Sequence, residues 1–74
     1  MSRAKLKQAR KGKGMTQQAV ADYLEVGERY YRAIEAGTRT GDFTLWDMLE
    51  ELLGVHQREL RTTPYTRLDK AENQ

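Results

Sequence analysis

The chain has 74 residues, 38% of them hydrophobic and 32% charged, and a net charge of +2. This length supports one small core, and a chain without cysteine forms neither disulfides nor thiolate metal sites, which favours a reducing cytoplasm. A single histidine and the lack of any apolar run near the roughly 18 residues of a membrane span argue against a metal centre, a histidine-based triad and a membrane anchor, so we expect a small binding module rather than an enzyme.

The first predicted element is a short helix over residues 5–10, where Leu6 and Ala9 share one face. Its surroundings are basic, because residues 1–13 hold six positive side chains and no acid. These charges favour contact with a polyanion, although they are also compatible with a helix face that is simply solvated. The six are Arg3, Lys5, Lys7, Arg10, Lys11 and Lys13.

Two further short helices follow, separated by about three residues at Glu25–Gly27. Thr16 is a typical N-cap for the first of them, and Gly37 ends the second, which is predicted over residues 28–36. The apolar residues follow helical spacing, with Val20, Ala21 and Leu24 in the first helix and Tyr31 and Ile34 in the second. Two short helices joined in this way describe a helix-turn-helix motif.

The clearest helical periodicity lies in residues 45–53, and Asp42 or Thr44 can cap that helix. Trp46 is expected in the core or at an interface. A last short helix is expected at Val55–Leu60, and residues 62–74 are predicted to form a polar tail. Residues 42–60 are acidic, with Asp42, Asp47, Glu50, Glu51 and Glu59 against Arg58 alone.

Several segments in one register resemble the Cro/repressor-type (XRE-like) helix-turn-helix family over about residues 4–60. The resemblance implies an all-α, five-helix domain in residues 1–61. It also implies sequence-specific binding to double-stranded DNA by a transcriptional regulator, commonly a repressor acting as a homodimer, with no cofactor or small-molecule substrate. The segments are Leu6–Arg10, Gly14–Gln17, Val20-Ala21 with Leu24 and Val26, Ile34–Gly37 and Leu53–Val55.

The resemblance makes the helix 28–36 the element that reads the major groove. Arg29 is the main candidate for reading a base, because its guanidinium fork matches the two acceptors of guanine. Glu28 can accept from cytosine or can complement the helix dipole, and Ala33 can touch a thymine methyl. Backbone or supporting contacts are expected from Gln17, Gln18, Tyr30, Arg32, Thr38, Arg39 and Thr40.

The resemblance also implies structural roles. Arg10 and Glu35 match a partly buried ion pair, and Tyr31 is expected in the core with its hydroxyl able to reach the surface. Glu25 stands where the family usually has a glycine with positive φ, and Gly27 stands where a Ser or Thr cap is usual. The dimer contact is expected from Val55, Leu60, Tyr65 and Leu68.

An alternative function is a protein-interaction module, such as an antitoxin or adaptor, that uses the acidic helix or the tail. Binding to random duplex DNA that weakens steeply with salt distinguishes a DNA-binding protein from such a module. The sequence contains no paired carboxylates in a plausible cleft, activated nucleophile or glycine-rich phosphate loop that would support an enzyme.

Overall fold

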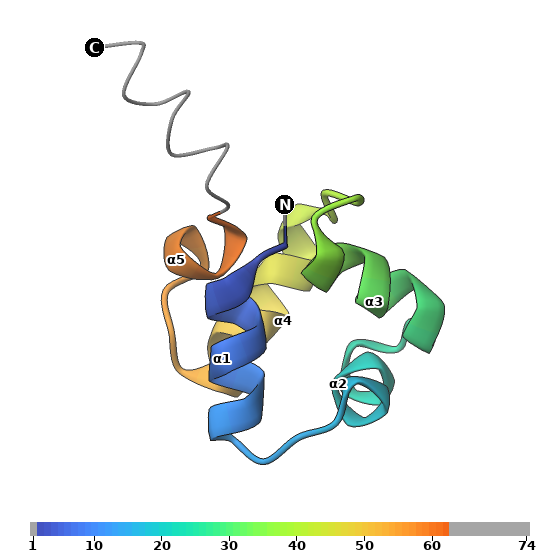
Figure 1. The fold of residues 1–74 in the computed structure, drawn as a ribbon, viewed down its shortest axis with the longest axis horizontal. Helices are drawn as coiled ribbons and strands as arrows, with labels where there is room; N and C mark the ends of the chain where they lie inside the picture. The colour runs from blue at the N-terminus through green and yellow to red at the C-terminus, as the bar shows by residue number, and fades with distance from the viewer. Residues whose placement is uncertain (1, 63–74) are drawn as a thin grey trace, which may run out of the picture.

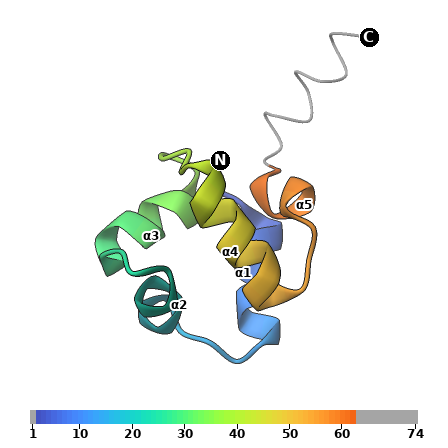
Figure 2. The ribbon, with the colours of Figure 1, turned by 180° about the vertical axis from the view of Figure 1, so that it is seen from behind.

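A computed structural model describes residues 2–62, which form an all-helical domain. The helices are α1 (Ala4–Gly12), α2 (Gln17–Leu24), α3 (Glu28–Ala36), α4 (Phe43–Leu53) and α5 (Gln57–Arg61). The helix-turn-helix pair α2–α3 lies at one end of the domain, and α5 lies at the other, against α1 and α4 (Figures 1 and 2). The expected all-α, five-helix fold is therefore confirmed. Of the expected tail, only Thr62 lies within the described residues.

Side-chain caps fix where two of the helices begin. The Thr16 hydroxyl accepts a hydrogen bond from the amide of Ala19 at 3.0 Å, which confirms it as the N-cap of α2. Of the two candidates for α4, Asp42 is the cap, because its carboxylate accepts from the amide of Leu45 at 2.9 Å. These bonds satisfy amides that have no partner within the helix.

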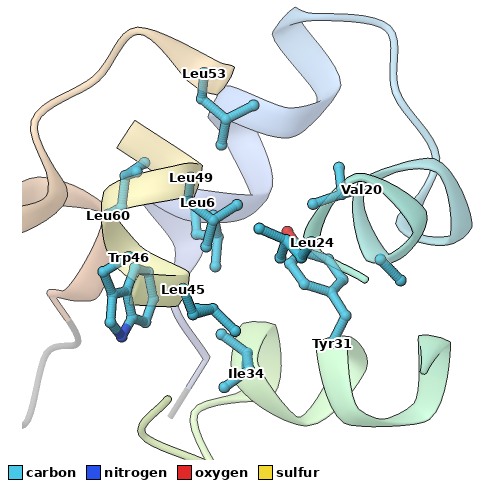
Figure 3. Close-up of a cluster of buried hydrophobic side chains, with 11 residues drawn as sticks. Leu6, Val20, Leu24, Tyr31, Ile34, Leu45, Trp46, Leu49, Leu53 and Leu60 are labelled. Atoms are coloured by element: carbon cyan, nitrogen blue, oxygen red, sulfur yellow. The ribbon is translucent and has the colours of Figure 1, made fainter. Parts of the chain in front are cut away.

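One core of eleven buried apolar residues joins all five helices. Trp46 is 2% exposed, so it belongs to this core. Figure 3 shows Ile34 of α3 and Leu45 of α4 pointing toward one another, with Tyr31 directed inward from α3. The core thus connects α3 to α4 through these side chains. Its members are Leu6, Val20, Ala21, Leu24, Tyr31, Ile34, Leu45, Trp46, Leu49, Leu53 and Leu60.

Two of the six basic residues near the N-terminus are interior: Arg10, which was expected in a partly buried ion pair, and Arg3, which was expected on the basic side of the molecule. Arg3 is 8% and Arg10 is 7% exposed. The guanidinium of Arg3 binds three backbone carbonyls from separate segments. Nη1 donates to the carbonyls of Ile34 at 2.6 Å and Arg39 at 2.9 Å, and Nε donates to the carbonyl of Arg61 at 3.1 Å. Arg3 therefore joins the C-terminal ends of α3 and α5.

None of the helices in residues 2–62 has the length and apolar character needed to cross a membrane.

Candidate nucleic-acid interface

The turn between α2 and α3 depends on one residue with a left-handed backbone conformation, Glu25, and on the small side chain of Ala21. Glu25 has φ of +61°, so the positive φ implied for this position is confirmed although a side chain is present. The amide of Val26 donates to the carbonyl of Ala21 at 3.0 Å, and Ala21 is fully buried where the helices meet. Because a larger side chain would separate the backbones, this alanine permits the tight turn.

The outward face of α3 carries charges that are already partly paired. Glu28 Oε2 accepts from Arg32 Nη2 at 2.9 Å, across one turn of the helix. A cytosine contact by Glu28 would therefore compete with this pair. Arg29 is exposed and has no carboxylate within 4.0 Å among residues 2–62. Arg29 is thus the available guanidinium in the first turn of α3, while Ala33 is half-buried further along.

The loop after α3 folds back on the last turn of that helix. The amide and hydroxyl of Thr38 donate to the carbonyl of Ala33 at 3.0 and 3.3 Å. The Arg39 guanidinium lies over the Tyr30 ring, with Cζ 5.7 Å from the centroid. A cation over an aromatic face is attracted to the ring, so Tyr30 positions Arg39. Thr40 is exposed at the end of the loop.

The two glutamines at the start of α2 have different partners. Gln17 is half-buried, and its Nε2 donates to Glu35 Oε1 at 3.1 Å. Gln18 is exposed, and its Nε2 donates to Asp22 Oδ1 at 2.9 Å. Gln17 therefore connects the start of α2 to α3, whereas Gln18 stays on the surface of its own helix.

Glu35 is the centre of a buried polar network behind α3. Arg10 Nε lies 2.5 Å from Glu35 Oε2, and Arg10 Nη1 donates to the carbonyl of Met15 at 2.9 Å. The Tyr31 hydroxyl donates to the same Glu35 oxygen at 2.8 Å. The expectation that this hydroxyl reaches the surface is wrong, because Glu35 holds it inside. The i, i+4 spacing of Tyr31 and Glu35 on one helix is the sequence signal for this contact.

The network keeps the Glu35 carboxyl ionised. Burial acts to raise the pKa of Glu35, but hydrogen bonds from Arg10, Tyr31 and Gln17 and the charge of Arg10 together outweigh burial, so the pKa lies below its usual value. Burial and the bond to Glu35 raise the pKa of Tyr31, so its hydroxyl remains a donor. The arrangement can therefore fix α1, α2 and α3 relative to one another.

The expected dimer residues are mostly not on the described surface. Leu60 is fully buried in the core of its own domain and is not on the described surface, and its expected place in a dimer contact stays a prediction. Val55 is half-buried beside that core. Tyr65 and Leu68 lie outside the described residues.

Two short helices joined by a tight turn, the second with an exposed polar face, form the helix-turn-helix of a class of DNA-binding proteins. The family model described as helix-turn-helix matches residues 6–60, well over half of the chain. The chain therefore belongs to the XRE-type helix-turn-helix family. No curated protein and no solved structure shows a significant match to this chain.

Proposed function

We propose that the protein is a sequence-specific transcriptional regulator, acting as a repressor, that reads the major groove of double-stranded DNA with α3. The observation that carries this proposal is Arg29, an exposed guanidinium without an acidic partner among residues 2–62, in the first turn of the second motif helix. Residues at this end of such a helix reach base edges. The sequence has no cysteine, which fits a reducing compartment, and we place the protein in the cytoplasm.

The residues around α3 would set its orientation on the duplex. Gln17 and the loop residues Thr38, Arg39 and Thr40 would contact phosphates or sugars, and Tyr30 would hold Arg39 in place. Further support is proposed from Gln18 and Arg32, and further base contacts from Glu28 and Ala33. Contacts to phosphates and sugars fix the register of the protein on the duplex, whereas base contacts carry the sequence information.

Replacing Arg29 with alanine is expected to weaken binding to the selected site by about 1–3 kcal/mol and to relax the preference at one base pair. The reason is the loss of a bidentate contact to guanine, which random DNA does not present in register. Affinities for the selected site and for random duplex DNA, measured at one salt concentration, test this. Lys13→Ala, which removes an exposed cation outside α3, is the control. Equal losses on both DNAs would make Arg29 a phosphate contact.

We further propose that the protein acts as a homodimer on an operator with two-fold symmetry. One reading helix contacts too few base pairs to select a site in a genome, and paired half-sites one helical turn apart supply the missing specificity. Val55, with Tyr65 and Leu68 of the segment beyond Thr62, would make the contact.

Selection of bound sites from a randomised DNA pool is expected to yield a dyad. Truncation after Arg61 should then reduce binding to the full operator far more than binding to an isolated half-site. Selected sites without a dyad, together with monomers alone in sedimentation with and without DNA, would overturn the dimer proposal. If the protein does not bind random duplex DNA even at low salt, the role as an antitoxin or adaptor replaces DNA regulation.

A further inference from the structure

We propose that the cavity between the N-terminal segment, the α3–α4 loop and α5 is a phosphate-binding site separate from the reading face of α3. Its volume is about 550 Å³, and three arginines line it: Arg3, Arg58 and Arg61. In both ribbon views the N-terminal segment lies between α5 and the end of α3 (Figures 1 and 2). The proposal goes beyond DNA reading, because its ligand need not be DNA.

Arg3 lines this cavity, and its guanidinium is already fixed in place. Its Nε and Nη1 are used by three backbone carbonyls, and its Cζ lies 5.2 Å from the centroid of the Trp46 ring. Within residues 2–62, Nη2 has no hydrogen-bond acceptor. Because the side chain cannot reorient without losing these contacts, Nη2 is a preorganised donor at the cavity.

The other lining residues add donors, and none of them is acidic. Arg58 and Arg61 are exposed and have no carboxylate within 4.0 Å in the described part of the chain. The amide of Arg58 donates to His56 Nδ1 at 3.0 Å, so the neutral imidazole carries its proton on Nε2 and can donate. Thr40 also lines the cavity, and a threonine hydroxyl can donate a hydrogen bond.

The nearest acids are engaged elsewhere. Glu59 is paired with Lys5 at 3.4 Å. The amide of Gln57, which also lines the cavity, donates to Asp47 at 2.7 Å and to Glu50 at 3.0 Å. None of these three acids lies within 4.0 Å of the side-chain nitrogens of the lining arginines, so the guanidiniums have no directly bound carboxylate within residues 2–62.

Like charge accumulates at this point of the fold. Burial and the neighbouring charge of Arg61 lower the pKa of Arg3. An anion bound between the guanidiniums would relieve this repulsion. A phosphate group fits better than a single carboxylate, because it brings up to two negative charges and more acceptor oxygens to the guanidinium forks of Arg58 and Arg61 and the remaining Nη2 of Arg3.

The phosphate could belong to a small phosphorylated molecule or to the DNA backbone, since Thr40 also lies in the loop proposed to meet DNA. The first arm of the test titrates inorganic phosphate and pyrophosphate into the full-length protein at constant ionic strength, with sodium acetate as the salt control, and follows backbone amide shifts. Saturable shifts at Thr40 and residues 56–62 are expected. Arg58→Gln/Arg61→Gln should weaken binding at least tenfold.

The matched control is Lys7→Gln/Lys11→Gln, which also removes two exposed charges one turn apart on a helix and should change pyrophosphate binding less than twofold. Both arginine side chains are exposed, so the double variant should fold, and Arg58→Gln alone serves if it does not. Saturable binding in the wild type that both double variants retain equally, or shifts that acetate reproduces, would overturn the proposal.

The second arm separates the two sources of phosphate. If the DNA backbone occupies the cavity, pyrophosphate should compete with duplex DNA, and the arginine double variant should reduce the log–log salt slope by about 1–2 on every sequence. If only a small phosphorylated molecule occupies the cavity, pyrophosphate should bind to the protein without changing its affinity for duplex DNA. A chain that binds pyrophosphate at this cavity but no DNA would overturn the proposed function and leave this site standing.

Discussion

Replacing Glu35 with glutamine is expected to lower the free energy of unfolding by about 3–5 kcal/mol, a large part of the stability of a small domain. The Glu35 side chain is 5% exposed and is the counter-ion of Arg10, which is 7% exposed. Glutamine preserves the volume but removes the charge, so the guanidinium would stay buried without a counter-charge. The Tyr31 hydroxyl would also lose a charged acceptor.

Urea unfolding followed by circular dichroism measures this loss. Glu28→Gln is the matched control, because it makes the same chemical change on the same helix in a pair whose Arg32 side chain is 61% exposed. Exposed pairs of this kind contribute about 0.3–0.5 kcal/mol. If the two substitutions cost the same, burial of the Arg10–Glu35 pair does not stabilise the domain.

The same pair predicts how stability depends on acid. The pKa of Glu35 is lower in the folded protein than its ordinary value of 4.5, so the unfolded chain binds more protons as the pH falls. The contribution of Glu35 is therefore complete above about pH 4.5 and is lost as the pH drops through the folded pKa. The stability difference between wild type and Glu35→Gln should shrink over that acid range.

Local rules were sufficient to predict the helices of the helix-turn-helix motif. The spacing of Tyr31 and Ile34 and the position of Gly37 predicted a helix over residues 28–36, and α3 has those bounds. Thr16 likewise marked the start of α2. These features follow from residues within one or two turns of one another, so a single sequence contains the necessary information.

The role of Arg3 could not be predicted in the same way. By composition it was one of six cations on a predicted basic side of the molecule, but its guanidinium is bound by carbonyls 31 to 58 residues away in the chain. Backbone carbonyls at helix ends leave no mark in a sequence. The burial of Leu60 could not be predicted for a related reason, because only the packing of α5 on α1 and α4 decides that this leucine faces inward.

The sequence predicted which residues lie on the outward face of α3, but it did not predict which of their side chains contact one another. Helical spacing placed Arg29 and Arg32 outward, and both are exposed. The i, i+4 pair between Glu28 and Arg32 was detectable from the same spacing, yet whether two exposed charges meet depends on rotamers. The placement of Arg39 over Tyr30 depends on how the loop folds back, which residue types alone do not specify.

Replacing Gly41 with alanine is expected to destabilise the domain by about 2–4 kcal/mol, from left-handed backbone strain and overpacking. Gly41 has φ of +78°, and a Cβ atom there would lie 3.0 Å from Trp46 Nε1, 3.2 Å from Leu45 Cδ2 and 3.3 Å from Ile34 Cδ1. These atoms belong to buried side chains, and the Trp46 indole is already fixed by a bond of 2.7 Å to the carbonyl of Thr40. The added methyl would therefore have to push α3 and α4 apart.

Gly54→Ala separates the two causes of this effect. Gly54 has a similar φ of +72°, but a Cβ atom there has nothing within 4 Å. Its substitution should cost only the backbone strain, about 1 kcal/mol. Thermal and urea unfolding of the two variants should thus differ by at least 1 kcal/mol, since Gly41 alone adds the contact with Ile34 and Trp46. Equal losses would mean that the core yields to a methyl group at Gly41, and that the position of α3 on α4 does not depend on the close approach of this glycine.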